Sequence, residues 1–522
     1  MTLTEWLIFF LVLQVIHFLG TWKLYKKAGR KAWEAIIPVY NAVVLMKIIN
    51  RPWWWVILLC IPVINVIMLP VIWVETIRSF GKNTTTDTIL VVVTLGLYIY
   101  YINYMLEVTH IEDRSLKPKT ATGEWVSSIL FAIVAATIVH TYFMQPYTIP
   151  TGSLERTLLV GDFLFVSKFH YGARTPMTAV SFPMVHDTIP KLGVKSYLEK
   201  PQYPYFRLPG FQKVKRNDIV VFSWPVDTVR YFRDQSGKHY YKPIDKKSNY
   251  VKRCVGVPGD SLAVVDGYVH INGKRTQLPD RAQLQFSYSG TTKGNNFNSQ
   301  SIYNRYKIKL GEFGYNNTQF SAAGMTEDAA TRFKNHPNVA SIQRNVTPKG
   351  VKDSNIFPNN GKVNWNSDNF GAIYIPEAGK TVKMDLKSFS LYRRIIEVYE
   401  GSEIGIENKL SVKGTQVLLN NTPIDSYTFK QDYYWMMGDN RHNSEDSRAW
   451  GYVPANHIVG KPVFIWLSLD SNAKGLFNKI RWERMFTTVG GNGTPTSYFR
   501  YFLILLAGWI IYRQYQKRKK KA

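Results

Sequence analysis

The chain has 522 residues, of which 45% are hydrophobic, and a formal net charge of +28 at pH 7. This length allows two or three domains, and so large a positive charge raises the question of a nucleic-acid partner. Much of the excess charge lies beside long uncharged runs, so anionic lipid head groups account for it better and we expect no nucleic-acid partner. The two cysteines, Cys60 and Cys254, lie in different regions and no metal-ligand spacing occurs. We therefore expect neither a disulfide framework nor a metal or other cofactor.

Four uncharged runs in the first part of the chain reach or approach the roughly 20 apolar residues that a helix needs to cross a bilayer. The alternative is that they form buried core helices. A fifth run, 501–512, is short and spans only if Tyr498, Phe499 and Arg500 extend it by snorkelling. We expect a multi-span membrane region over 1–124, an anchor helix at 125–143 and a possible membrane helix at 498–512. The four runs are 6–22, 53–74, 88–106 and 125–143.

The distribution of Lys and Arg in the short loops predicts an orientation, because cytoplasmic loops carry the excess of basic residues. Placing the more basic loops inside puts the N-terminus and the large segment 144–497 outside, and the tail inside if the last run spans. The counts are seven basic residues in 23–52, two in 75–87, three in 107–124 and six in the tail 513–522.

Residues 144–497 are rich in β-branched and aromatic residues, broken by Gly, Pro and Asn, which is typical of antiparallel sheets. Segment 280–360 is poorer in apolar residues and indicates an insertion or cap. The expected fold class is α-helical membrane segments followed by a mainly-β domain of antiparallel sheets with an inserted cap. The clearest strand-like runs are DFLFVSKF (162–169), DIVVFSW (218–224) and HIVGKPVFIWLS (457–468).

Ser153 stands soon after the anchor region, in the sequence IPTGSLERTLLVGDFLFVSK (149–168). A serine hydroxyl is a poor nucleophile and needs a base. No GxSxG sequence surrounds Ser153, which disfavours an α/β-hydrolase triad. His170 and His442 are candidate bases, but histidines are more often structural or exposed. A Ser–Lys dyad is the other option.

A lysine serves as a base only when it is uncharged, so its side chain needs an apolar place that lowers its pKa. Lys252, in YVKRCVGVPGD (250–260), meets that demand. Strand alternation places it on one face with Tyr250 and small residues, whereas Arg253 points to the other face. Lys168, on the strand after Ser153, is the rival and resembles an ordinary surface lysine.

A third cluster, MGDNRHNSEDSRAWGYVP (437–454), sets a run of polar residues between apolar stretches. Such a run is usually a solvated loop. A polar turn held between buried strands must instead satisfy its own hydrogen bonds, and Asp446 and Arg448 are placed to form an internal ion pair.

These three stretches, with RNDIVVFSWP (216–225), resemble the ordered boxes of bacterial type I signal peptidases. The order of membrane anchor, serine box, strand, lysine box and polar box also matches. The resemblance covers roughly 140–275 and 430–470, and it is specific because four motifs occur in one order.

The resemblance implies that Ser153 is the nucleophile and Lys252 the general base. It implies that the Thr151 hydroxyl and the Ser153 backbone N–H stabilise the oxyanion. Ser444 would hydrogen-bond and orient the Lys252 amine.

The resemblance also implies supporting and substrate-binding roles. Asp446 and Arg448 would brace the polar loop. Ile149, Pro150 and Leu154 match positions near shallow apolar pockets for small substrate side chains.

The sequence departs from the family pattern at three positions. Leu154 replaces the commoner Met, Arg156 stands where many members have Pro, and His442 stands where many have Asp. None of these touches the dyad. The stretch 276–430 exceeds the compact members and resembles an enlarged cap, and residues 1–110 lie outside the resemblance.

The leading hypothesis is a membrane-anchored serine endopeptidase that removes signal peptides from exported preproteins. Its partners would be signal-peptide-bearing preproteins and the lipid bilayer, and its place the bacterial inner membrane with the catalytic domain on the external, periplasmic face. One alternative is a catalytically silent membrane-bound scaffold or binding module of the same fold. Another is a self-cleaving or regulatory Ser–Lys protease, which the external catalytic domain disfavours.

Overall fold

The computed structural model describes residues 2–118, 120–229, 234, 236–294, 296–360, 363–473, 475 and 477–519. Lys119, one of the basic residues behind the predicted orientation, and residues 520–522 of the basic tail lie outside these ranges. The chain forms two compact units. Unit 1 is Met1–Phe143, Arg174–Arg207 and Val229–Lys246, and unit 2 is Met144–Ala173, Leu208–Thr228 and Lys247–Ala522.

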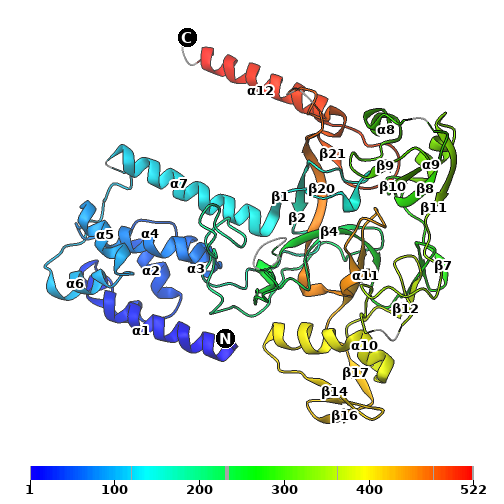
Figure 1. Cartoon of the computed structure of the whole chain (residues 1–522). Helices are drawn as coiled ribbons and strands as arrows, with labels where there is room; N and C mark the ends of the chain where they lie inside the picture. Colours follow the sequence, from blue (N-terminus) through cyan, green and yellow to red (C-terminus); the bar gives the residue numbers. More distant parts are fainter. Residues whose placement is uncertain are drawn as a thin grey trace. The chain divides into compact units, whose positions relative to one another are not determined.

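The predicted fold class is confirmed: unit 1 holds apolar helices, and unit 2 is mainly β with antiparallel sheets (Figure 1). Within the described residues, two helices are long and apolar enough to cross a membrane. One is α1 (Leu3–Lys27), whose first turn is closed by a capping box between Thr2 and Glu5. The other is α7 (Ala121–Ile138), which continues as a π-helical turn to Phe143.

The run 53–74, a predicted membrane span, is not one continuous helix. This run forms α3 (Trp55–Cys60) and α4 (Ile64–Ser79), separated at a break that contains Pro62, where the ring removes a backbone donor. Arg51 Nη2, before the run, lies 2.9 Å from Glu75 Oε2, just after it. A straight helix of that length would hold its ends about 33 Å apart, so the run folds back on itself.

The run 88–106 is also not one straight helix. It forms α5 (Thr85–Val93) and α6 (Tyr98–Met105), whose axes differ by 117°. Gly96 lies in the break with a φ of +88°, and a Cβ there would lie 2.9 Å from the Trp73 ring, so only glycine fits.

Glu75 contacts the segments that flank the two interrupted runs, 53–74 and 88–106. Its carboxylate contacts Arg51, Arg78 (4.0 Å) and, through Oε2, Arg114 Nη2 at 2.6 Å. Ile111 N also donates to Ser79 O at 2.9 Å. Three segments therefore meet at one end of the helix block: the residues just before the run 53–74, those just after it, and those just after the run 88–106. The remaining helical elements of this block are η1 (Ala32–Ala35) and α2 (Tyr40–Ile48).

Part of the segment expected to belong to the β domain lies in unit 1 instead. Residues 174–207 form an irregular antiparallel hairpin with bridges such as Thr178 to Gln202. The Trp6 ring stacks on Tyr203 with a centroid separation of 4.4 Å, and Trp6 Nε1 donates to Gln202 O at 2.9 Å. These contacts attach the hairpin to the start of α1. The short helix η4 (Ile244–Lys246) belongs to the same unit.

Unit 2 is built on an antiparallel sheet with the strand order β1-β2-β20-β3-β4-β18-β19, to which β21 is added by pairing with β20. Its two faces carry separate apolar clusters, one around Leu164 and Val221 and the other around Phe222 and Cys254. The strands are β1 (Met144–Thr148), β2 (Asp162–Ser167), β3 (Ile219–Ser223), β4 (Asn249–Gly256), β18 (Tyr433–Met437), β19 (Val453–Pro454), β20 (Ile458–Ser468) and β21 (Thr487–Thr488).

The stretch 276–430, expected to be one cap, is divided. Residues 286–344 form a four-stranded sheet, β11-β8-β10-β9, with two helices over its own apolar cluster. The chain then returns through β12 (Phe370–Tyr374), which completes a sheet in the order β12-β5-β6-β7. The elements are β5 (Ser261–Val265), β6 (Tyr268–Ile271), β7 (Lys274–Arg275), β8 (Phe286–Thr292), α8 (Ser299–Tyr306), β9 (Phe313–Tyr315), β10 (Gln319–Met325), α9 (Glu327–Lys334) and β11 (Val339–Arg344).

The remainder of this stretch carries two small sheets, β13-β17 and β14-β15-β16, beside a helix. Their apolar residues join the largest cluster, which also contains Trp435 of β18. The elements are β13 (Thr381–Lys383), α10 (Leu386–Arg394), η5 (Ile395–Tyr399), η6 (Ser402–Ile404), β14 (Leu410–Lys413), β15 (Gln416–Leu419), β16 (Thr422–Ile424) and β17 (Ser426–Thr428).

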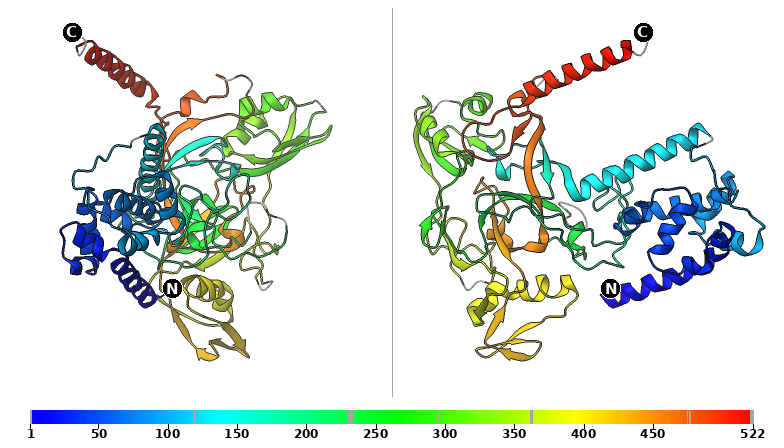
Figure 2. Two further views of the ribbon diagram at one scale, coloured as in Figure 1. Left: turned by 90° about the vertical axis from the view of Figure 1, so that its left-hand side faces the viewer. Right: turned by 180° about the vertical axis from the view of Figure 1, so that it is seen from behind.

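The C-terminal helix α12 (Phe499–Lys519) projects from the rest of unit 2 in both views of Figure 2. None of its described side chains is buried, and its apolar part 501–512 is exposed along its length. It is not among the two helices long and apolar enough to cross a membrane, so a span at 498–512 stays a prediction. The other short helices are η3 (Gly152–Leu154), α11 (Ser447–Trp450), η7 (Ala455–His457) and η8 (Trp482–Arg484).

Candidate active site

A single tight turn presents Ser153. After β1, Ile149 N donates to Asp162 O at 2.9 Å and Gly161 N donates to Ile149 O at 3.0 Å, which fixes the base of the loop. The 3-10 turn η3 carries Ser153, and the side chain of Leu154 anchors it at 1% exposure in the apolar cluster below. Ser153 itself is buried. Its hydroxyl is therefore held on a rigid support close to β4.

Lys252 reaches Ser153 from the middle of β4. Its Nζ lies 2.7 Å from Ser153 Oγ, although the two residues are 99 positions apart. β4 lies between β3 and β18, with Lys252 opposite Val220 and Arg253 opposite Met437. The lysine side chain is only 5% exposed. The fold thus brings the predicted nucleophile and the predicted base into hydrogen-bond contact in a place that excludes most water.

The surroundings of Lys252 favour its uncharged form. Burial lowers its pKa to about 8, while the charges of Asp446 and Glu445 raise it and that of Arg448 lowers it. The Tyr250 ring, whose centroid lies 5.4 Å from Nζ, also favours the charged form. Desolvation dominates because opposite charges favour the ammonium and yet the pKa falls. A substantial fraction of the amine is therefore neutral near physiological pH.

The two histidines considered as alternative bases have other contacts. His170 Nδ1 lies 2.5 Å from Ser167 Oγ. His442 lies between Ser287 N, which donates to Nδ1 at 3.0 Å, and the carboxylate of Asp368. Lys168, the rival lysine, is half-buried just after β2.

The polar loop 438–448 is buried at both ends, whereas Asn443 and Glu445 in its middle are exposed, and its own charges brace it. The predicted ion pair between Asp446 and Arg448 is present, with Arg448 Nη2 2.8 Å from Asp446 Oδ2. Gly438 N donates to Asp446 Oδ2 at 3.0 Å, and Arg448 Nη2 donates to Arg441 O at 2.7 Å. Burial raises the pKa of Asp446, but the Arg448 guanidinium outweighs it and holds that pKa below its usual value. The ion pair is therefore shielded from solvent, with both side chains at most 4% exposed.

A second buried ion pair was not predicted from the sequence. Arg253 donates from Nε to Asp439 Oδ1 at 2.8 Å and from Nη2 to Oδ2 at 2.6 Å, and the two side chains are 1% and 0% exposed. The Thr157 hydroxyl donates to the same carboxylate at 2.6 Å. This pair ties β4, beside Lys252, to the 438–448 loop.

The predicted bond between Ser444 and Lys252 is not formed in this structure. Within the part of the chain that is described, Ser444 Oγ is buried and has no hydrogen-bond partner. It packs against Gly438, where any Cβ would overlap both Ser444 Oγ and the Ser153 carbonyl oxygen. The Lys252 amine instead contacts Ser153.

The remaining predicted site residues flank the serine turn. Thr151 precedes the turn in an extended conformation, with φ of −130° and ψ of 156°, and is half-buried. Pro150 is exposed, whereas Ile149 and Leu154 are 4% and 1% exposed in one apolar cluster. These two side chains support the turn from below. Their contact with a substrate stays a prediction.

Residues of the inserted stretch (276–430) also lie at the serine turn, the turn η3 that carries Ser153. Lys309 Nζ lies 3.1 Å from the place a Cβ would take on Gly152, and Glu155 and Glu312 are close to the same point. Burial raises the pKa of both carboxyl groups. This neighbourhood could not be predicted from the sequence, because it depends on a long-range contact made by a segment with no recognisable pattern.

Comparisons with known proteins agree with this geometry. A family model described as "Signal peptidase, peptidase S26" matches residues 122–313 and 360–467, more than half of the chain. A second model, of a family of unknown function (DUF5684), matches residues 33–113.

Several curated relatives are signal peptidases. The chain is 26% identical to signal peptidase I of Buchnera aphidicola (subsp. Acyrthosiphon pisum), over 71% of this chain and 82% of the relative. It is 30% identical to signal peptidase I of Rickettsia felis, over 67% and 81%, and 24% identical to that of Helicobacter pylori (strain 26695), over 71% and 92%. The match to the family model over most of the chain and the likeness to these relatives lead to one conclusion: the chain belongs to the signal peptidase family, peptidase S26.

Proposed function

We propose that this chain is a membrane-anchored serine endopeptidase that removes signal peptides from exported preproteins, with Ser153 as nucleophile and Lys252 as general base. The 2.7 Å contact between the buried Lys252 amine and Ser153 Oγ carries the assignment of the two residues. Membership of the peptidase S26 family supports the endopeptidase activity, and the relatives named signal peptidase I support the substrate class. An intact pair of this kind also argues against a catalytically silent scaffold.

The reaction follows from the chemistry of this pair. The neutral amine of Lys252 takes the proton of the Ser153 hydroxyl as Oγ attacks the scissile carbonyl carbon. The tetrahedral oxyanion accepts hydrogen bonds from the Ser153 N–H and the Thr151 hydroxyl, which we assign to this role. The Lys252 ammonium then gives its proton to the leaving amine as the C–N bond breaks. Lys252 next deprotonates a water molecule that cleaves the Ser153 ester and restores both residues.

The anchor explains why the nucleophile lies where it does in the chain. Ser153 follows Phe143, the last residue of the helical anchor segment, by only ten residues. Ten residues reach at most about 33–36 Å, so the serine is tethered near the membrane surface. A signal peptide ends its apolar segment a few residues before the cleavage site. The substrate is therefore expected to present its scissile bond at a similar depth.

The direct test uses the purified full chain in detergent with a preprotein that carries a signal peptide. We expect one cut, after the small residues that follow the apolar segment, identified from the N-terminus of the product. Failure to cleave the preprotein, or cleavage at many unrelated sites, would contradict the proposal. A variant of the preprotein with bulky residues at the cleavage site is the matched control and should remain uncut.

The pH profile is a further prediction, because the base must be neutral. With the pKa of Lys252 at about 8, kcat/KM should fall as the pH drops below about 8 and level off above it. The charge of Glu445 raises the pKa of Lys252. Replacing Glu445 by Gln removes that charge, so the acidic limb should move to lower pH, by less than about one pH unit since this side chain is exposed. Glu407→Gln, also exposed, is the control and should leave the profile in place.

The orientation of the helix block extends this proposal. Arg51, Glu75 and Arg114 are in contact, so both broken runs start and end at the same side. We place that side in the cytoplasm of a bacterial cell because its loops are the most basic. Both runs then enter the bilayer and return, and loop 75–87 is cytoplasmic. The N-terminus and the segment 144–497 remain external.

This topology predicts a labelling pattern. Cys254 is fully buried, so replacing the exposed Cys60 by Ser leaves a silent background for single cysteines. Asn83→Cys, at an exposed position between α4 and α5, should resist a membrane-impermeant maleimide added to intact spheroplasts and react after lysis. Val351→Cys, which is 50% exposed in unit 2, should react in both cases. Labelling of Asn83→Cys from outside would instead restore the four-span topology.

A further inference from the structure

The polar loop 438–448 is joined to the inserted stretch by main-chain bonds. Gln285 N donates to Asp439 O at 2.9 Å, and Arg441 N donates to Gln285 O at 2.9 Å, which makes a short parallel bridge. On its other side the loop holds the serine turn, because Asn440 N donates to Ser153 O at 3.0 Å. Displacement of the inserted stretch would therefore be passed to Ser153.

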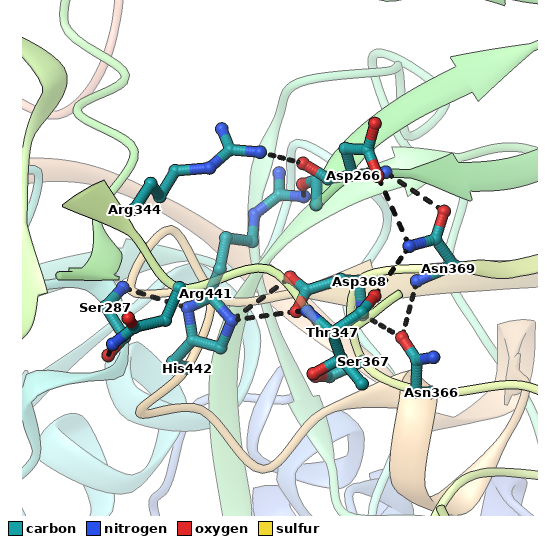
Figure 3. Close-up of polar contacts among 12 residues, drawn as sticks. Asp266, Ser287, Arg344, Thr347, Asn366, Ser367, Asp368, Asn369, Arg441 and His442 are labelled. Atoms are coloured by element: carbon teal, nitrogen blue, oxygen red, sulfur yellow. Dashed lines mark hydrogen bonds and ion pairs between the residues drawn. The ribbon is translucent and has the colours of Figure 1, made fainter. Parts of the chain in front are cut away.

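One side chain adds a second connection at this junction. His442 Nδ1 accepts from Ser287 N at 3.0 Å, at the start of β8. Its Nε2 lies 3.1 Å from Asp368 Oδ1 and 3.3 Å from Oδ2, just before β12 (Figure 3). His442 thus connects the loop to two separate parts of the inserted stretch.

These two contacts fit one tautomer of the ring. Ser287 N–H can only donate, so Nδ1 must carry a lone pair, and the carboxylate of Asp368 requires a proton on Nε2. The neutral imidazole protonated at Nε2 satisfies both. An imidazolium would turn a second N–H towards the Ser287 N–H, and that bond would be lost.

Asp368 is itself fixed from the other side. Thr347 N donates to Asp368 Oδ2 at 2.9 Å, and Asn366 Oδ1 accepts from Asp368 N at 3.0 Å. Burial raises the pKa of Asp368, but the hydrogen bonds from His442 and Thr347 outweigh it and keep the pKa below its usual value. The carboxylate is a charged, stationary acceptor for His442 (Figure 3).

Charges of both signs surround the ring. Asp368 contacts it directly, and Asp266 lies beyond Asn369. Arg344 lines the same cavity, Arg441 is its neighbour in the loop, and Arg448 interacts with Asp368. The cavity has a volume of about 590 Å³ and is bordered by His442 and Asp368.

We propose that His442 is a positioning residue that connects the 438–448 loop to the inserted stretch and so holds Ser153 within reach of Lys252. This inference rests on the proposed function of Ser153 and Lys252. It assigns the inserted stretch a part in catalysis, as the support of the loop.

The variants that test the role differ in one hydrogen bond. His442→Ala removes the acceptor for Ser287 N–H, and we expect kcat to fall about tenfold, the worth of one such bond, with KM within about twofold. His442→Asn keeps a short side chain with an acceptor oxygen and should recover kcat to within about threefold of the wild type. Asn retains no titratable group. His270→Asn, on the nearby strand β6, is the control and should behave as the wild type.

The split between kcat and KM, together with rescue by Asn, separates positioning from a merely structural contribution. Wild-type kcat in His442→Ala, or a kcat in His442→Asn no higher than in His442→Ala, would overturn the proposal.

A measurement that does not depend on catalysis separates failure of the role proposed for His442 from failure of the function proposed for Ser153 and Lys252. Amide hydrogen exchange of the Ser287 segment should be faster in His442→Ala than in the wild type and close to the wild type in His442→Asn. That comparison holds in the Ser153→Ala background, in which no cleavage is expected. Unchanged exchange in His442→Ala would contradict the role of His442 whatever the activity of the chain.

Discussion

Replacement of Lys252 by Met is expected to lower the cleavage rate of a preprotein by about 10²–10⁴-fold, the range that general-base catalysis supplies. Methionine fills similar space but cannot take the proton of Ser153, whose Oγ lies 2.7 Å from the Lys252 amine. The free energy of unfolding should not fall, because an apolar side chain replaces a buried amine. Cleavage rates and thermal unfolding of the full chain in detergent measure both effects.

Two further variants sharpen this result. Ser153→Ala should cause a comparable loss, and the double variant should be no slower than either single one, since residues that act as a unit are not additive. Lys168→Met is the matched control and should keep its activity. If Lys252→Met retained more than about a tenth of the wild-type rate, Lys252 would not be the general base.

The second large effect concerns stability. Asp439→Ala should lower the free energy of unfolding by about 3–5 kcal/mol, because it leaves the charge of Arg253 buried without its partner. Arg253 is 1% exposed, and both oxygens of Asp439 accept from it. The same change should reduce activity, since the pair ties β4 to the loop that holds Ser153. Urea unfolding followed by tryptophan fluorescence measures the change.

The control for this prediction is an ion pair in solvent. Asp328 and Arg332 have side chains 78% and 51% exposed, and Asp328→Ala should cost less than about 1 kcal/mol. The double variant Arg253→Met, Asp439→Leu should be more stable than Asp439→Ala alone, because it leaves no unpaired buried charge. Equal losses for Asp439→Ala and Asp328→Ala would show that burial does not determine the worth of the Arg253–Asp439 pair.

The inserted stretch contacts both the serine turn and the 438–448 loop. Lys309 and Glu312 lie at the serine turn, and Gln285 bonds to the loop that holds it. His442 then links that loop to Ser287 and Asp368. An insertion attached only to the rim of the sheet would not make these contacts. The stretch is therefore part of the environment in which the dyad works.

Much of the candidate site could be predicted from the sequence because its chemistry is local. The alternation along 250–256 separates Lys252 from Arg253 by strand geometry alone. Asp446 and Arg448 are two residues apart, so their ion pair needs only a turn. The apolar runs at 6–22 and 125–143 likewise became the continuous helices α1 and α7, since a long uncharged run favours a helix wherever it lies.

The tertiary structure alone decided the features that depend on distant partners. The run 53–74 does not predict the contact between Arg51 and Glu75. This contact requires the run to fold back on itself. The partner of His442, Asp368, and that of Arg253, Asp439, are 74 and 186 residues away. Composition and periodicity report what a segment can bury, but not which charged group it will meet. Such pairings are chosen when the whole chain packs and each buried charge must find its counter-charge.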